Sequence, residues 1–449
     1  MRVLLFYLFL PFIVGIGVWR PFWGLAIYLA ANIIRPDTLF WGQDTAMIIF
    51  KVSIAATLLG FFQSEGNKID PLTVREWWLA LWICLAMTVC VLFADLPENP
   101  IVWSYVGDSS RALILYWLIL GVLRKKQQAL QLMDILLLMA TLLSLWGWQQ
   151  HFGGNARLEG LGGFETNGVA ALGVLFLPLA VHKLFTASEW WQKLFGLGAT
   201  IMIAGMIVFT NSRGGFLGLA AGCLYLLLIS RKRIWLGICY FLVLLAVVPL
   251  LSSDYLARLN TIDQSSKSPE EEYSAGSRVV LWNAGWLMFK DNPIFGVGLF
   301  NFPRAKAPYR VQLAGKFDND LLDYSFLEYK VGHSTWFGQV LPEGGLFLAI
   351  PMFWLFMSFF WRTRKLPWTR PPTEETRPLY DTLTGLEAGF FGYLVSITFV
   401  NSLYSPFLIM HVILSVQVIR IIENSNPRQT QFHEDPLSLS ANSFSARSR

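Results

Sequence analysis

Two arginines and one histidine are the residues of this sequence best suited to chemistry on an anionic substrate. Arg213 lies in the turn "NSRGG", Arg278 opens the segment "SRVVLWNAGW", and His333 lies in "GHSTWFGQ". Guanidinium groups bind phosphate oxygens through paired hydrogen bonds, and a neutral imidazole can accept a proton near neutral pH. These residue types suggest stabilisation of a leaving anion combined with general-base catalysis.

Each of these residues also has a simpler explanation. Arg213 could be an arginine that snorkels to the membrane surface, and a lone histidine is more often structural than catalytic. We favour function because the two glycines after Arg213 permit a tight turn. Ser277 is expected to cap a helix that begins at Arg278, and the dipole at a helix N-terminus favours anions rather than cations. Helix stability alone therefore does not explain Arg278.

The elements that must position these residues are membrane helices. Of 449 residues 54% are hydrophobic and 14% are charged, against roughly 25% charged in soluble domains. The sequence predicts an all-α, polytopic membrane protein with about twelve or thirteen transmembrane helices. Apolar blocks that could cross the hydrocarbon layer begin near residues 3, 22, 44, 77, 111, 129, 168, 194, 214, 234, 336, 382 and 405.

The basic residues of the short loops predict the orientation, because cytoplasmic loops are enriched in Lys and Arg. The expected units are residues 1–251 as N-terminal spans, 252–335 as a large periplasmic loop with amphipathic helices, 336–423 as C-terminal spans, and 424–449 as a disordered cytoplasmic tail. The net charge of +5 restates this loop bias and is no argument for nucleic acid. The cytoplasmic side is expected to hold Arg124, Lys125, Lys126, Lys193, residues 231–233, Arg362, Arg364, Lys365, Arg370 and Arg377.

Three motifs resemble those of the O-antigen ligase family of bacterial membrane glycosyltransferases. They are "NSRGG" at 211–215, "SRVVLWNAGWLMFKDNPIFGVGLFNF" at 277–302 and "GHSTWFGQVLPEGG" at 332–345, in the family's order. The opening "WRPFWGLAIYLAANIIRPDTLFWG" is similar to the subgroup of O-glycosylation ligases associated with exosortase systems.

The resemblance implies a GT-C-like enzyme of the bacterial inner membrane with its active site facing the periplasm. Such an enzyme transfers a glycan from undecaprenyl pyrophosphate to an acceptor hydroxyl on a lipid, a protein or a growing glycan, and it needs no metal ion or other cofactor. By the same resemblance Arg213 and Arg278 would bind the pyrophosphate and His333 would deprotonate the acceptor. Direct displacement with inversion at the anomeric carbon is the expected reaction.

Further polar residues on the same face are expected to support the site. Arg304, Lys306 and Arg310 could extend the surface for the anionic donor, although a basic patch against lipid headgroups would use the same residues. Arg157 and Asn167 could complete the site. Tyrosines of the external loop could stack on sugars or form an interfacial aromatic belt, and they are Tyr255, Tyr273, Tyr309, Tyr324 and Tyr329.

Glu343 lies inside a predicted span and needs a partner there. At 1.5 Å per residue it is about 15 Å from His333 along a regular helix, and Pro342 is expected to bend the span. We predict a structural ion pair between Glu343 and Lys51 within the membrane, or a protonated glutamate that hydrogen-bonds to the backbone.

Other functions remain open at this point. A repeat-unit polymerase would use the same donor, and a transporter of lipid-linked oligosaccharides or a proton-coupled carrier could also have a dozen spans. ATP-driven transport would need another subunit, because the sequence has no P-loop. A metal-dependent oligosaccharyltransferase could use Asp318 and Asp320 in "FDNDLLDY", and sensitivity to EDTA would separate it from a metal-independent enzyme.

Overall fold

The computed structural model describes residues 2–36, 43–64, 73–93, 100–154, 158, 160, 163–230, 232–235, 237–238, 269–328 and 330–425. Within these ranges the chain is helical, without a β-strand, and the predicted all-α fold is confirmed. Most of the span predicted from about residue 234, Arg157, residues 252–268 of the predicted loop and residues 426–449 of the tail lie outside the described residues.

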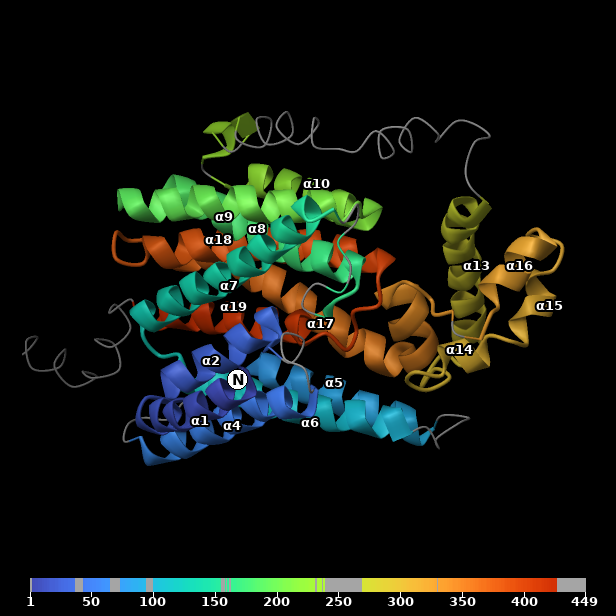
Figure 1. Cartoon of the computed structure of the whole chain (residues 1–449), viewed down its shortest axis with the longest axis horizontal. Helices are drawn as coiled ribbons and strands as arrows, with labels where there is room; N and C mark the ends of the chain where they lie inside the picture. Colours follow the sequence, from blue (N-terminus) through green and yellow to red (C-terminus); the bar gives the residue numbers. More distant parts are fainter. Residues whose placement is uncertain are drawn as a thin grey trace, which may run out of the picture.

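The first helices of the chain form one side of the bundle (Figure 1). Helix α4 packs against both α1 and α2, and α5 packs against α6. Gly60 of α4 lies so close to α1 that a Cβ atom there would be 2.4 Å from the carbonyl oxygen of Val18. Small residues therefore set the spacing of these helices. The bounds are α1 (Arg2–Trp19), α2 (Pro21–Ile34), α4 (Gln43–Gln63), α5 (Arg75–Leu92) and α6 (Pro100–Val122).

Helix α8 is the centre of the second group of helices. It packs against α9, α10 and α18, and residues 169–182 are all buried. Such a helix is apolar all round because protein covers every face. Gly385 and Gly389 of α18 face the α8 backbone, with a Cβ at Gly389 only 2.1 Å from the Leu175 oxygen. The bounds are α7 (Lys126–Phe152), α8 (Thr166–Thr186), α9 (Trp190–Phe209), α10 (Arg213–Ile229), α17 (Leu341–Thr369), α18 (Arg377–Ser396) and α19 (Pro406–Asn424).

Several of these helices are long and apolar enough to cross a membrane. Among the described residues six meet the length and hydropathy of a span, and five further apolar helices are shorter. The chain is therefore a multi-pass membrane protein. The six are Arg75–Leu92, Lys126–Phe152, Thr166–Thr186, Trp190–Phe209, Trp336–Thr369 and Pro406–Asn424.

A small second core lies at one end of the bundle, where α13 (Pro269–Asp291) crosses the other helices (Figure 1). Val280, Leu281 and Met288 of α13 pack there against side chains of the following segment. That segment contains α14 (Phe302–Ala305), α15 (Tyr309–Leu313) and α16 (Asn319–Ser325).

The predicted start of α13 at Ser277 is wrong. The helix begins eight residues earlier at Pro269, since proline suits the first helical position and the glutamates that follow suit the N-terminal end of the helix dipole. Ser277 is buried inside the helix. Arg278 therefore lies in the middle of α13, so the argument from its place at the helix N-terminus no longer applies.

Candidate functional site

The three motifs meet at the end of the bundle that α13 crosses (Figure 1). Helix α10 begins there at Arg213, α18 ends there at Ser396, and the short π-helix Trp336–Val340 leads into α17. The segment 397–405 connects α18 to α19 at the same end. Side chains of residues 397–405 contact the other segments that meet at this end of the bundle.

The turn before α10 is fixed from both sides. Ser212 caps α10, with its Oγ accepting a hydrogen bond from the Gly215 N–H at 3.1 Å, and the same hydroxyl donates to Asn167 Oδ1 at 2.8 Å. Asn167 lies in the first turn of α8. Arg213 is exposed as the first residue of α10. Asn167, which was predicted from the sequence to bind substrate, thus contacts Ser212, the residue that positions Arg213.

An aromatic chain joins the Arg213 turn to α13. Phe399 packs directly on Gly214, where an added Cβ would be 2.8 Å from the Phe399 Cβ. The Phe399 ring lies 5.9 Å from the ring of Trp282, and the Trp282 indole Nε1 donates to the Gly332 oxygen at 3.0 Å. One aromatic pair therefore links the turn of Arg213, the helix of Arg278 and the residue before His333.

Side chains and backbone groups hold the His333 segment against the α18–α19 connection. Asn401 Oδ1 accepts from the Ser334 N–H at 2.9 Å. The Thr335 hydroxyl donates to the Val400 oxygen at 2.8 Å and accepts from the Ser402 N–H at 2.9 Å. These contacts satisfy backbone groups where the chain is not yet helical.

His333 is partly buried among positive charges. Burial, together with the positive charges of Arg278, Lys330 and Lys306, lowers the pKa of its imidazole to about 4. The ring is therefore neutral near pH 7 and able to accept a proton. The structure thus brings Arg278 and His333 into electrostatic contact, as a shared site requires.

Unusual backbone conformations gather in the three motifs. Among the described residues four non-glycine residues have a positive φ: Arg35, Asn211, Phe300 and His333. The last three lie in "NSRGG", "GVGLFNF" and "GHST", at φ of 50°, 59° and 46°. Left-handed backbone costs free energy for residues with a Cβ and concentrates at functional sites. The three turns are therefore held by their surroundings rather than by local preference.

Lys306 points inward instead of toward a donor, so that expectation is wrong. Its side chain is 1% exposed, and its Nζ donates to the oxygens of Leu327 at 2.6 Å and Lys330 at 2.7 Å, with Ser325 at 3.3 Å. Burial lowers the pKa of the Lys306 ammonium to about 8, helped by Lys330. Lys306 fixes the loop that leads to His333.

The other supporting residues have mixed positions. Tyr309 is 7% exposed and packs in the core beside α13, so its ring is not open to a sugar, contrary to the expectation. Arg310 forms an ion pair with Asp323, and Arg304 is exposed. Four residues lie outside the described residues or have undescribed side chains: Arg157, Tyr255, Tyr273 and Tyr329.

Glu343 is buried, and its partners are neutral. Its Oε1 accepts from the Phe302 N–H at 3.1 Å, and its Oε2 accepts from the Tyr404 hydroxyl at 3.0 Å. Lys51 is exposed on α4. The predicted ion pair between Glu343 and Lys51 is therefore wrong, because the loops around α17 supply two hydrogen-bond donors that sequence distance concealed.

The break in α17 lies after Glu343. Gly345 has φ 57° and ψ −160°, whereas Pro342 lies in the first turn of α17, where proline fits. The backbone groups freed by the break pair with the glycine-rich loop: the Val297 N–H donates to the Pro342 oxygen at 2.8 Å, and the Leu346 N–H donates to the Pro293 oxygen at 2.8 Å. The bend expected at Pro342 is thus a glycine break, stabilised by the loop.

The acidic loop near α16 has a structural explanation. Asp318 caps α16 by accepting from the N–H groups of Asp320 at 3.1 Å and Leu321 at 3.4 Å. In the part of the chain that the structure describes, no group of three or more His, Cys, Asp or Glu residues is placed to hold a metal ion.

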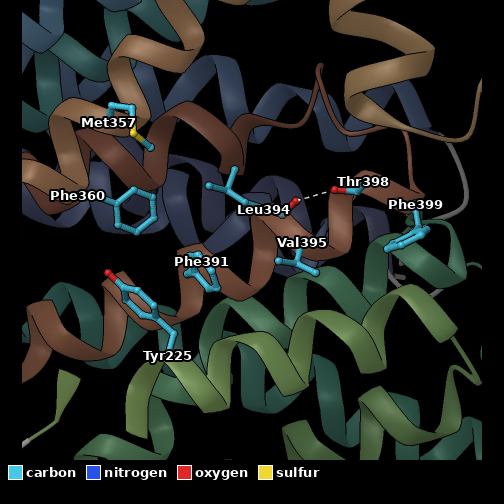
Figure 2. A pocket seen from close by; sticks show the side chains of 8 residues that line it. All are labelled: Tyr225, Met357, Phe360, Phe391, Leu394, Val395, Thr398 and Phe399. Carbon is cyan, nitrogen blue, oxygen red and sulfur yellow. Dashed lines mark hydrogen bonds between the residues drawn. The ribbon is translucent and has the colours of Figure 1, made fainter. Parts of the chain in front are cut away.

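An apolar cavity of about 490 Å³ adjoins the site between α10, α17 and α18. Figure 2 shows its lining, from Tyr225 and Phe360 at one end to Phe399 at the other. Phe399 is thus shared between the cavity and the aromatic chain beside Arg213. At the far end the Tyr225 hydroxyl donates to Glu387 Oε1 at 2.7 Å.

Sequence reasoning missed the residues that assemble the site. Phe399 and Asn401 come from a connection without a recognisable motif, and Trp282 lies in a motif of which only Arg278 was expected to contribute to the site. The one available signal was the polar run "NSLYS" at 401–405 between two apolar spans, because polar backbone at the end of a span needs partners.

Comparison with known families gives one match. Residues 198–326 match a family described as O-Antigen ligase, a range that contains Arg213 and Arg278 and ends before His333. No curated protein matches the chain. The match covers less than a third of the chain, and it lies on the part that carries two of the three motifs that resemble that family.

Proposed function

We propose that this chain, as an O-antigen ligase-like membrane glycosyltransferase, transfers a glycan from undecaprenyl pyrophosphate to an acceptor hydroxyl. The observation that carries the proposal is the convergence of Arg213, Arg278 and His333 at one end of a membrane helix bundle. A lipid-linked donor would reach this site from within the bilayer.

The arginines would stabilise the leaving group. A departing pyrophosphate carries several negative charges, and preorganised guanidinium groups stabilise such charge most strongly in a partly dehydrated site. Arg213 at the start of α10 and Arg278 on α13 approach from different elements, so they could contact different phosphates. The site would bind the donor before the acceptor arrives.

His333 would act as the general base. As the acceptor oxygen forms its bond to the anomeric carbon, the hydroxyl proton passes to the imidazole, and the bond from the anomeric carbon to the pyrophosphate oxygen breaks. The bonding electrons leave with undecaprenyl pyrophosphate. A single displacement of this kind inverts the anomeric centre. With its pKa lowered to about 4, the imidazole is unprotonated and available to accept a proton, and the negative charge of a bound pyrophosphate would offset the cations and raise its basicity.

The apolar cavity beside α18 would hold part of the isoprenoid chain of the donor. Its lining is aromatic and aliphatic, and it ends at Phe399 beside the Arg213 turn. An isoprenoid in this cavity would place its pyrophosphate near the arginines. The basic residues lie at the ends of α17 and α18 that are farthest from the site. They support an orientation in the inner membrane in which the site faces the periplasm.

Detection of both products tests this function. The purified protein in detergent is given glycan on undecaprenyl pyrophosphate and a panel of acceptors, namely a lipid core, a protein and a second lipid-linked glycan, with EDTA present. We expect glycosylated acceptor and free undecaprenyl pyrophosphate in equal amounts. Movement of intact donor across a reconstituted bilayer without cleavage would instead identify a transporter, and loss of transfer on EDTA addition would identify a metal-dependent enzyme.

A further inference from the structure

A second pocket lies at the end of the bundle opposite to α13. It has a volume of about 530 Å³, and its lining comes from the N-terminal end of α5 and the C-terminal ends of α17 and α19. Helix α17 begins beside His333 and spans roughly 43 Å at 1.5 Å per residue, so its last turns lie far from the candidate site. The lining residues are Arg75, Trp361, Arg362, Lys365, Leu366, Thr369, Arg370, Glu423 and Asn424.

Positive charge exceeds negative charge at this pocket. Four of its lining residues are cationic, and Glu423 is the one carboxylate among them. Arg362 is already occupied, because it donates to Glu76 at 2.9 Å and to Glu423 at 3.1 Å. Lys365 is exposed beside this network. The pocket therefore keeps a cationic surface after its internal ion pairs are formed.

Arg420 is a partly buried cation beside the same ion-pair network, outside the lining of the pocket. It lies near enough to Arg362, Glu423 and Glu76 to interact with each of them electrostatically. Its Nη1 is buried and has no hydrogen-bond partner in the structure. The charge of Arg420 therefore adds to the positive potential around Arg362 and Glu423.

The surroundings of the pocket indicate the membrane interface. Trp361 lines the pocket and is 70% exposed, and Trp368 on the next two turns of α17 is 89% exposed. Exposed tryptophans at the end of a span are typical of the headgroup level of a bilayer. Leu366 and Trp361 give the pocket an apolar wall beside its cations, which suits a ligand with both a charged group and an acyl chain.

We propose that this basic pocket binds the phosphate group of an anionic phospholipid. Basic pockets between membrane helices on the cytoplasmic side recognise such headgroups. The shared chemistry is a phosphate group bound by Lys365, Arg75 and Arg370, which line the pocket. A free phosphate ion would use the same cations but would not need the apolar wall or the interfacial position. The proposal is independent of glycan transfer.

Lipid binding to the purified full-length chain tests the proposal, without any glycan donor present. Native mass spectrometry measures the retention of phosphatidylglycerol, of cardiolipin and of zwitterionic phosphatidylethanolamine, with and without inorganic phosphate. We compare wild type with Lys365→Gln and Arg75→Gln, both at residues that line the pocket. Lys193→Gln serves as the control because it removes an exposed lysine near the start of α9, at the same end of the bundle but outside the pocket.

We expect the two anionic lipids to bind more tightly than phosphatidylethanolamine and each pocket substitution to weaken them about fivefold. Lys193→Gln leaves the affinity unchanged. Equal affinity for all three lipids, equal affinity in the pocket and control variants, or displacement of the lipid by inorganic phosphate would each overturn the proposal.

Discussion

Glu343 and Glu76 are both buried carboxylates in membrane-spanning helices, yet the two ends of the bundle satisfy them by different means. Near the candidate site Glu343 accepts from the Phe302 N–H and the Tyr404 hydroxyl. At the opposite end Glu76 accepts from Arg362 at 2.9 Å and from the Ser358 hydroxyl at 2.9 Å. Regular helices bring side chains together there, whereas at the site loops bring backbone donors.

The difference concerns where positive charge is left for a ligand. At the opposite end Arg362 and Arg364 form ion pairs with the buried carboxylates of Glu76 and Glu387. At the site end the buried carboxylate of Glu343 is satisfied by neutral groups, and the positive charge of Arg278 acts on His333 instead. The comparison suggests that the buried charges of the far end serve stability, with the cations at its pocket surface left for a lipid headgroup, whereas at the site end the charge of Arg278 is left for an incoming donor.

Removal of Glu76 is the strongest test of the far end. Glu76→Ala leaves Arg362 with Glu423 as its one described carboxylate partner, and we expect a loss of about 3 kcal/mol in the free energy of unfolding. Thermal unfolding in detergent measures it. The double variant Glu76→Gln/Arg362→Met should recover much of the loss, and a double variant as unstable as Glu76→Ala would show that the ion pair is not the cause.

Substitution of Glu343 should have a smaller effect on stability, because no buried cation is left behind. Glu343→Ala removes the acceptor of the buried Phe302 N–H, which costs about 1–3 kcal/mol, while Glu343→Gln retains an acceptor and should cost less. Lys51→Met serves as the control and should unfold like wild type. A destabilised Lys51→Met would restore the ion pair that the sequence suggested.

The cap of α16 should contribute still less. Asp318→Ala removes the acceptor for two N–H groups and should cost about 1 kcal/mol, while Asp318→Asn keeps most of the cap. Unfolding temperatures and transfer rates are compared with and without EDTA. An EDTA effect on wild type that Asp318→Asn abolishes would show that Asp318 binds a metal ion rather than only capping the helix.

The smallest change is expected from pH. The pKa of His333 is lowered to about 4 in the folded protein, so the folded state favours the neutral imidazole. The resulting contribution to stability is fully present above the pKa of the unfolded state, about 6.5. This contribution is lost as the pH falls through about 4. Accordingly kcat/KM should stay nearly constant from pH 8 to 5 and then decline. A decline centred near 6.5 that His333→Ala removes would show that the imidazole is not held among cations.

The same comparison explains what the sequence could predict. Apolar blocks predicted the membrane helices, and basic loops predicted which helix ends lie on the same side of the membrane. Both features follow from local composition. Arg213, Arg278 and His333 were proposed from residue type and motif order. Phe399, Asn401 and Tyr404 were not, because their contacts join segments more than 60 residues apart and leave no periodic pattern. For the same reason the sequence analysis paired Glu343 with Lys51, a charged residue inside another predicted span, and not with hydrogen-bond donors from a loop.

Lys306 and Tyr309 show the same limitation in the loop. A basic residue after a glycine turn reads as a surface charge, and a tyrosine reads as an exposed ring. Only the fold of residues 302–330 around α13 buries both side chains. Such packing could not be predicted from the sequence, because the Lys306 ammonium and its carbonyl acceptors are far apart along the chain.

The measurement that tests the central claim most directly is the transfer rate of purified Arg213→Ala, Arg278→Ala and His333→Ala beside wild type, with EDTA present. Lys316→Ala is the matched control, because it removes an exposed basic residue of the same loop. We expect each arginine substitution to lower kcat by about 10²–10³-fold and His333→Ala to lower it by about 10²–10⁴-fold, with unfolding temperatures preserved and Lys316→Ala unchanged. Full activity in His333→Ala, or equal losses in Lys316→Ala, would contradict a site formed by these three residues.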